Sequence, residues 1–384
     1  MYTFLLVPNT SPGADQGASA APVEVVRLRS ILATAVAHNA TDIHIRAGDV
    51  VYARVEGELV ALDTGVLTAK STFEMARHIL ETSAGTPPIT EIHDYSGPWS
   101  APGIGRFRLS LLLQRSSFMI VMRVIPDVLP TFESLSLPSS LTSISLSEFG
   151  LILVAGTPGS GRSSTVAAFL NQLNTKSPRR RHIVSVEQAI RYLHRNNVCA
   201  VTQREVGIDT DSFLTGVKAA MDQDADVIVI GDLNSPDLVD IAVRAAEQGR
   251  LVIGKIRATD TTSAVRALLG HFPADRQDSA RLQLSELLRG VVAQRLLPRS
   301  DSRGRIVAAE VLLMTPLVRD VMTDAGRLSE LRQTISEGRA QYGTQTFDQH
   351  LADRVIAGQV TFEVAVTLAT NSLDFELQLR GLRR

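Results

Sequence analysis

The stretch "GTPGSGRSST", residues 156–165, constrains the fold more than any other part of the chain. It matches the phosphate-binding pattern G-x-x-x-x-G-K-[ST] except at Arg162, which stands where the pattern has lysine. The glycines allow the backbone to turn sharply and to direct consecutive N–H groups at a phosphate. The loop residues predicted to bind a nucleotide are Gly156, Thr157, Pro158, Gly159, Ser160, Gly161, Arg162, Ser163 and Ser164.

The segments on either side of this loop support a phosphate-binding interpretation. The preceding run "GLILVAG" is apolar and predicts a buried parallel strand. The following run "STVAAFLNQLN" has the apolar spacing of a helix, whose N-terminus would face the anion. Ser163 would then supply the hydroxyl that holds Mg²⁺. The alternative interpretation is an ordinary Gly/Ser turn between a strand and a helix.

Composition narrows the class of protein. The length of 384 residues suggests two or three domains, and the net charge of −1 gives no overall field toward nucleic acid or an anionic membrane. The single cysteine, Cys199, is expected to be buried and fits a reducing cytoplasm. No apolar window approaches the roughly 18 residues of a membrane span, so no transmembrane segment is expected. The basic run at 179–182 lacks interleaved aromatics, so nucleic acid is not an expected partner.

The first third of the chain predicts a small α+β domain over residues 23–125. Residues 1–22 are rich in small residues, proline and glycine, and are expected to form a flexible N-terminus. Three prolines within 126–138 predict a linker. Helices are expected at "VEVVRLRSILATAVAHN" and "STFEMARHILETS". Strands are expected at "DIHIRAG", in "VVYARVEGELVAL" with a turn near Glu56-Gly57, and as an antiparallel pair at "IGRFRLSLLLQ" and "SFMIVMRVI".

Residues 139–330 predict an α/β domain with a parallel sheet, because apolar strands alternate with amphipathic helices. Strands are expected at "RHIVSVE", "ADVIVIGD" and "RLVIGKI", and helices at "TDSFLTGVKAAMDQD" and "SPDLVDIAVRAAEQG". Ser235, Pro236 and Gly249 mark the two ends of the last helix. The rest of the chain is expected to be mostly helical, with a helical C-terminal region over 331–384.

These segments together resemble the type IV pilus retraction (twitching motility) ATPases, the PilT/PilU-like branch of the type II/IV secretion ATPase superfamily. The resemblance covers nearly everything after residue 24. It implies an N-terminal PAS-like α+β domain and a C-terminal RecA-like P-loop domain that binds ATP or ADP with Mg²⁺. The matching segments include "ATDIHIRAG", "GIGRFRLSLLLQR", "VLPTFESLSLP", "TQREVGIDTDSF", "AAEQGRLVIG", "LSELLRGVVAQRLLP", "TPLVRDVM" and "QYGTQTFDQHL".

The resemblance also implies partners and a location. It implies a homo- or hetero-hexamer, the latter with a PilT-like paralogue, at the cytoplasmic base of a pilus. There the ring would meet an inner-membrane platform protein. Arg106, Arg108 and Arg123 match arginines that reach the nucleotide of a neighbouring subunit. The alternative for these three residues is a solvated strand face.

Two of the catalytic boxes of the family, the phosphate-binding loop and the acidic box, have different residues in this chain. The lysine of the phosphate-binding loop is Arg162, whose planar guanidinium replaces a compact ammonium. The acidic box, Asp-Pro-Ile-Glu in the family, is "QAIR" here. Gln188 replaces its aspartate and Arg191 replaces its catalytic glutamate. Arg191 carries a charge that cannot be lost in a protein, so it cannot serve as a general base.

The other two boxes are also altered. The Walker B box is "GDLN", with Asp232 for glutamate and Asn234 for arginine. Asp232 keeps a carboxylate with a shorter reach, and is the second candidate Mg²⁺ ligand beside Ser163. The histidine box is "GKIRA", with Lys255 for threonine and Arg257 for histidine.

These changes predict a site that binds nucleotide but hydrolyses ATP slowly or not at all, because added positive charge favours a polyphosphate while catalysis needs metal ligands and an oriented water. A second interpretation is an active variant ATPase that drives retraction. A third is a site filled by its own arginines, paired to Asp232, Glu187 or Glu205, that binds nothing. Elsewhere, His44 and Asp42 resemble a metal or acid/base pair, but with no third ligand nearby we interpret them as structural.

Overall fold

The computed structural model describes residues 5–6, 22–55, 57–83, 86–301 and 304–382. Most of the segment predicted to be a flexible N-terminus, and Glu56 of the predicted turn, lie outside the described residues. The chain divides into an N-terminal unit, Met1–Asp127, and a C-terminal unit, Val128–Arg384. Among the described residues, no helix is long and apolar enough to cross a membrane.

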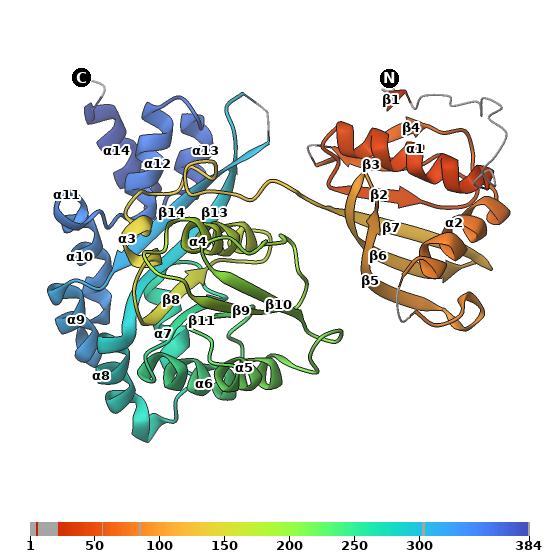
Figure 1. The fold of residues 1–384 in the computed structure, drawn as a ribbon. Helices are drawn as coiled ribbons and strands as arrows, with labels where there is room; N and C mark the ends of the chain where they lie inside the picture. The colour runs from red at the N-terminus through yellow and green to blue at the C-terminus, as the bar shows by residue number, and fades with distance from the viewer. Residues whose placement is uncertain (1–4, 7–21, 56, 84–85, 302–303, 383–384) are drawn as a thin grey trace. The chain divides into compact units, whose positions relative to one another are not determined.

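The N-terminal unit is a seven-stranded sheet with two main helices (Figure 1). The sheet has the order β1-β4-β3-β2-β7-β6-β5, and it confirms the expected antiparallel pair as β6 and β7. Its elements are β1 (Leu5–Leu6), α1 (Val23–Ala37), β2 (Asp42–Ile45), β3 (Tyr52–Val55), β4 (Glu58–Asp63), α2 (Ala69–Glu81), the 3-10 helix η1 (Ile89–Glu91), β5 (Asp94–Ala101), β6 (Gly105–Gln114) and β7 (Ser117–Ile125).

The core of this unit forms where α1 and α2 cover one face of the sheet. Leu28 and Leu32 of α1 and Met75 of α2 are fully or almost fully buried, as are Phe107 and Leu109 of β6. The apolar faces of the helices and of the strands therefore pack together in one cluster. Strand β5 was not predicted. It contains Gly and Pro residues of low strand propensity, which the sheet tolerates because β5 is an edge strand.

The C-terminal unit is a second seven-stranded sheet, with the order β10-β9-β11-β12-β8-β13-β14. All neighbours are parallel except β13 and β14, which are antiparallel. Its strands are β8 (Gly150–Ala155), β9 (His182–Glu187), β10 (Ala200–Glu205), β11 (Val227–Ile230), β12 (Leu251–Ile256), β13 (Leu288–Pro298) and β14 (Arg305–Leu313). This is the predicted α/β architecture, with the glycine-rich loop that was predicted to bind phosphate following the interior strand β8.

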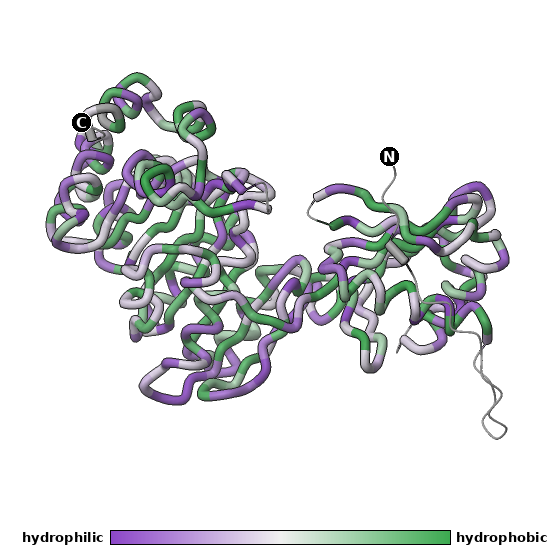
Figure 2. The backbone as a smooth tube through the Cα atoms, turned by 90° about the horizontal axis from the view of Figure 1, so that it is seen from above, coloured by the Kyte–Doolittle hydropathy of each residue, from purple (hydrophilic) through white to green (hydrophobic). Residues whose placement is uncertain are grey.

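Helices cover both faces of this sheet. Helix α4 packs on one face with α3, while α5, α6 and α7 pack on the other (Figure 1). Figure 2 shows apolar residues concentrated along the strands inside each unit. The helices are α3 (Leu141–Ser145), α4 (Arg162–Lys176), α5 (Phe213–Asp222), α6 (Pro236–Glu247), α7 (Thr261–Leu269), η2 (Ala274–Arg276), α8 (Gln277–Leu287), α9 (Pro316–Thr323), η3 (Ala325–Glu330), α10 (Leu331–Glu337), α11 (Arg339–Tyr342), α12 (Phe347–Ile356), α13 (Phe362–Leu368) and α14 (Ser372–Leu382).

The expectation of a mostly helical chain after β12 is wrong for residues 288–313. Two long strands, β13 and β14, form there, and β13 pairs with β8. Their apolar runs are buried nearly continuously, so they lack the alternation that distinguishes a strand from a helix. The region from α9 to α14 is helical, as expected.

The segment predicted as a linker is partly packed on the C-terminal unit. Phe132 lies edge-on against Phe169 of α4, with ring centroids 4.9 Å apart. The Asn171 side chain donates a hydrogen bond to the carbonyl of Pro130 at 3.1 Å. The stretch that follows β7 is thus anchored to the helix that begins at the phosphate-binding loop.

Candidate nucleotide-binding site

The loop between β8 and α4 has the backbone that a phosphate requires. Gly159 and Gly161 have positive φ angles of 80° and 92°, and Gly161 caps the start of α4 in the left-handed region. A Cβ on Gly156 would lie 2.2 Å from the Oγ of Ser160, so only glycine fits there. The N-terminus of α4 therefore opens directly onto the loop, and these residues fit a bound phosphate.

A buried glutamine holds the loop in place from the neighbouring strand β13. The Nε2 of Gln294 donates a hydrogen bond to the carbonyl of Ser160 at 2.7 Å, and Gln294 is 1% exposed. Sequence reasoning missed this residue. The only signal was that Gln294, together with Arg295, interrupts the apolar run "GVVAQRLL".

Arg162, at the position of the family lysine, is bonded to the backbone of β12. Its Nη1 donates to the carbonyl of Ile256 at 3.0 Å, and the residue is half-buried. Burial lowers the pKa of Arg162, with Asp232 opposing the shift and Arg257 adding to it. One N–H of the guanidinium is therefore committed to a carbonyl of the protein.

Lys255, near the end of β12, points at the same loop. Its Nζ donates a hydrogen bond to the Oγ of Ser163 at 3.3 Å. Burial lowers the pKa of Lys255, while the carboxylate of Glu187 opposes that shift. The sequence identifies Lys255 only as a replacement for the family's threonine, whereas the structure brings its ammonium to the hydroxyl predicted to hold Mg²⁺.

Glu187, the last residue of β9, is the carboxylate that accompanies Lys255. It accepts hydrogen bonds from Ser185 at 3.0 Å and from Gln203 of β10 at 3.2 Å. Burial raises the pKa of Glu187, and the nearby Lys255 opposes the rise. A carboxylate with two donors and a neighbouring ammonium is well satisfied without a metal ion.

Asp232 follows β11 and is paired with Arg257, which follows β12. The Nη2 of Arg257 lies 3.3 Å from the Oδ2 of Asp232, and Asn234 donates to the same oxygen at 3.4 Å. The side chain of Asp232 is 17% exposed and that of Arg257 is 67% exposed. Within the described part of the chain, the buried Oδ1 of Asp232 has no hydrogen-bond partner. The Walker B carboxylate is thus engaged by a cation on one oxygen only.

Gln188 and Arg191 lie in the loop between β9 and β10, and both are exposed. This loop is tied to the start of α4, because the hydroxyls of Tyr192 and Ser164 are hydrogen-bonded at 2.8 Å. Arg191 is close enough to Lys255 to lower the pKa of that lysine further, after the larger effect of burial. The structure therefore brings Arg191 to the nucleotide site, and it adds Tyr192, which sequence reasoning missed.

The two residues predicted to hold Mg²⁺ do not form a fitting donor set. Mg²⁺ prefers oxygen ligands free of competing cations. Here the Oγ of Ser163 contacts Lys255, and the Oδ2 of Asp232 contacts Arg257. Across the described residues, no group of three or more His, Cys, Asp or Glu side chains could hold a metal ion.

The three arginines predicted to contact a neighbouring subunit lie on the N-terminal sheet, Arg106 and Arg108 on β6 and Arg123 on β7. Arg108 and Arg123 are directly paired across these strands. The Nε of Arg123 also donates to Asp42 at 2.8 Å, which gives Asp42 a structural partner. A contact of these arginines with a neighbour's nucleotide stays a prediction.

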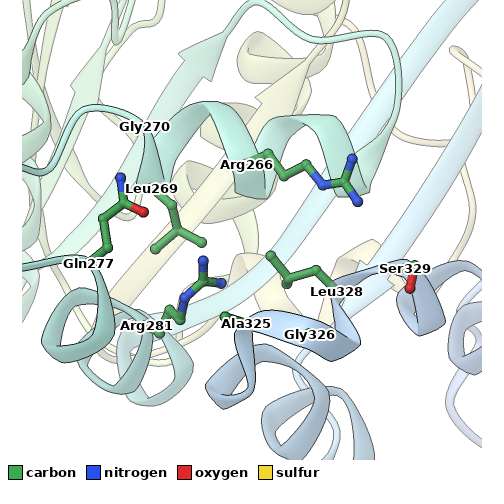
Figure 3. Close-up of a pocket in the computed structure, with 9 residues that line it drawn as sticks. All are labelled: Arg266, Leu269, Gly270, Gln277, Arg281, Ala325, Gly326, Leu328 and Ser329. Atoms are coloured by element: carbon green, nitrogen blue, oxygen red, sulfur yellow. The ribbon is translucent and has the colours of Figure 1, made fainter. Parts of the chain in front are cut away.

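A separate pocket lies away from these residues, between α7, α8 and η3 (Figure 3). Its volume is about 410 Å³, and Arg266, Arg281 and Gln277 contribute its polar lining together with Ser329. None of the residues predicted to bind nucleotide lines it. The nucleotide site is therefore defined by the loop after β8 rather than by this pocket.

Comparison with known proteins identifies relatives for almost the whole chain. The sequence model of the family described as "Type II/IV secretion system protein" matches residues 105–349. The chain is 35% identical over 355 residues to the type IV pilus ATPase PilU of Pseudomonas aeruginosa, covering 92% of each chain. It is 30% identical over 338 residues to the retraction ATPase PilT of the same organism, covering 88% of this chain and 96% of PilT.

Solved structures of related ATPases are also similar to this chain. The crystal structure of the pilus retraction motor PilT with bound ADP superposes with a TM-score of 0.80 at 30% identity, covering 91% of this chain and 99% of that one. The ATPase DotB of Legionella pneumophila has a TM-score of 0.77 at 20% identity, which supports the fold alone. The relatives confirm the fold class that the sequence predicted, with an N-terminal domain, an ATPase domain and a helical tail.

Proposed function

Because the chain belongs to the PilT/PilU-like type IV pilus ATPases of the type II/IV secretion superfamily, we propose that it is a nucleotide-binding component of a pilus retraction motor with impaired or absent ATP hydrolysis. The observation that carries this proposal is the ion pair between Arg257 and Asp232. It places a cation on one oxygen of the carboxylate that stands at the family's Walker B position.

Impaired hydrolysis follows from the chemistry of phosphoryl transfer. That reaction needs in-line geometry, neutralised phosphate charge and an oriented water. Arg191 stands where a glutamate would orient or deprotonate that water, and a guanidinium cannot accept the proton. Arg162 gives one N–H to the carbonyl of Ile256, so the orientation of its planar guanidinium is set partly by the protein and not by the phosphates alone. No single change of protonation state repairs these positions.

Nucleotide binding is supported by the parts of the site that remain. The glycine loop keeps its left-handed turns, and α4 keeps its N-terminus at the phosphate position. The relative PilT was crystallised with ADP, and this chain shares its fold over most of its length. The cations Arg162, Lys255 and Arg257 would attract a polyphosphate. We therefore propose ATP or ADP as the ligand.

For the assembly, we propose a hexamer, formed alone or with an intact PilT-like paralogue, at the cytoplasmic base of a pilus. It would act there as a peripheral component beside an inner-membrane platform protein. Arg106, Arg108 and Arg123 would contact the nucleotide of the neighbouring subunit. The support is the retained family scaffold, which extends over both units.

A second candidate function is an active variant ATPase that drives retraction itself. It is favoured by Arg162, which keeps the positive charge of the lysine, and by Asp232, whose Oδ1 is not engaged by a cation. The two functions differ in what happens when the chain is mixed with an intact PilT-like paralogue.

The deciding experiment measures phosphate release by the chain alone, by the paralogue alone and by defined mixtures. An accessory subunit changes the turnover of the paralogue while contributing none of its own. A chain that contributes turnover in proportion to its amount supports the second function. A mixture that equals the paralogue alone, with no nucleotide bound by this chain, contradicts the proposed function.

A further inference from the structure

The ammonium of Lys255 contacts the hydroxyl of Ser163, which was predicted to hold Mg²⁺. Lys255 is near the end of β12, which pairs with β8 immediately before the phosphate-binding loop. From there its Nζ reaches the Oγ of Ser163, 3.3 Å away, in the first turn of α4. In phosphate-binding loops this hydroxyl is the one that contacts Mg²⁺ at the β- and γ-phosphates. The ammonium of Lys255 therefore contacts the hydroxyl of Ser163 that would otherwise ligate the metal ion.

The charges around Lys255 reinforce this arrangement. Glu187 is a counter-ion to Lys255, and it is held by Ser185 and Gln203. Asp232, the other carboxylate of the site, already has Arg257 on its Oδ2. A divalent cation entering here would meet the ammonium of Lys255 and the guanidinium of Arg257, which repel it at short range.

We propose that this site binds ATP or ADP without a divalent cation, with Lys255 supplying the positive charge that Mg²⁺ supplies in other phosphate-binding loops. The inference rests on the proposed function, since it assumes that nucleotide binds. It goes further in naming the ligand as the free nucleotide anion and Lys255 as the residue that determines this preference. Ser163 then positions the ammonium and does not ligate a metal.

The experiment measures ADP binding to the purified full-length chain by isothermal titration calorimetry, once with excess EDTA and once with excess MgCl₂. We expect the affinity in EDTA to be at least as high as the affinity in MgCl₂. Lys255→Thr, which restores the family's residue, should weaken binding in EDTA by about tenfold or more, equivalent to roughly 1.4 kcal/mol. Its affinity should also rise when MgCl₂ is added, because Ser163 is released.

Lys218→Thr is the matched control, because Lys218 is exposed on α5 and should leave both affinities unchanged. The wild-type comparison does not depend on whether Lys255→Thr folds. Binding by the wild type that requires MgCl₂ would overturn this inference and leave the proposed nucleotide-binding function intact. A wild type that binds no ADP in either buffer would overturn both.

Discussion

Arg257 and Asp232, which follow the neighbouring strands β12 and β11, form an ion pair of 3.3 Å at the mouth of the nucleotide site. The two residues replace a histidine and a glutamate of the family boxes, and the structure joins them to each other. Lys255 makes a second contact within the site, a hydrogen bond from its Nζ to the Oγ of Ser163 at 3.3 Å. Both residues predicted to hold Mg²⁺ are therefore contacted by a cation that the altered boxes supply.

Repair of single positions should not restore hydrolysis. Arg162→Lys alone should leave kcat almost unchanged, because Arg191 and the Arg257–Asp232 pair persist and residues that act as a unit are strongly non-additive. The measurement is kcat for each single variant and for the combined one. Full turnover from Arg162→Lys alone would contradict the account. The combination expected to restore turnover is Arg162→Lys, Gln188→Asp, Arg191→Glu, Asp232→Glu, Lys255→Thr and Arg257→His.

Arg181 should prove structural, although it belongs to a basic run that could suggest a binding surface. Its side chain is fully buried and donates to the carbonyl of Ser147 at 2.8 Å, beside Glu148 at 3.2 Å. Arg181→Ala should lower the free energy of unfolding by about 3 kcal/mol, because buried acceptors lose their donor and a cavity forms. Arg179→Ala, at an exposed ion pair, is the control and should change little in urea unfolding. Equal effects of the two variants would refute this role.

Stability should fall as the pH drops below neutrality, because of buried His350. Burial lowers the pKa of His350 to about 3, and its Nδ1 accepts a hydrogen bond from the backbone N–H of Ala309 at 2.9 Å. The unfolded chain takes up a proton near pH 6.5 and the folded one does not, so the folded state loses stability from there down to about pH 3. Between pH 7.5 and 5.5 the cost is about 1.4 kcal/mol for this group.

The variant that isolates this group is His350→Gln, which offers an acceptor that does not titrate in this range. Urea unfolding at the two pH values should show a difference smaller by about 1.4 kcal/mol than in the wild type. His194, whose pKa burial lowers to about 4, acts with the same sign and accounts for part of what is left. An unchanged pH difference in His350→Gln would rule out the assignment.

Much of the fold was predictable because local signals agreed with the tertiary structure. The six apolar residues of β8 are all buried, and Ser235 caps α6 through the N–H of Leu238 as its position suggested. The sequence patterns did not predict strands whose formation depends on packing against distant segments. Strand β10 carries polar residues at a sheet edge, and β13 is buried on both faces, so neither has the pattern of a half-buried strand.

The site was predictable where a motif fixes it and unpredictable where distant segments meet. The turn after β8 and the start of α4 at Arg162 follow from the spacing of residues 156–165. The hydrogen bond from Gln294 to Ser160 joins residues 134 apart in the chain, and no local pattern encodes it. The sequence showed that Lys255 replaces the family's threonine. The contact of Lys255 with Ser163, however, depends on the register of β12 against β8.

Assembly into rings should persist despite the altered site. The segments shared with PilU and PilT extend over both units, and the changed positions cluster around the phosphate-binding loop. Multi-angle light scattering of the purified chain, alone and with an intact PilT-like paralogue, should detect a hexamer in at least one of the two samples. A strict monomer in both samples would contradict the proposed assembly.

The most direct test of the central claim is steady-state phosphate release by the purified full-length chain, with saturating ATP and excess MgCl₂. The account predicts turnover at least about 100-fold below 1 s⁻¹ per subunit, the low end for ordinary enzymes, because cations contact both predicted metal ligands and Arg191 replaces the water-positioning glutamate. Turnover near 1 s⁻¹ per subunit would contradict it, and would identify the chain as an active variant motor.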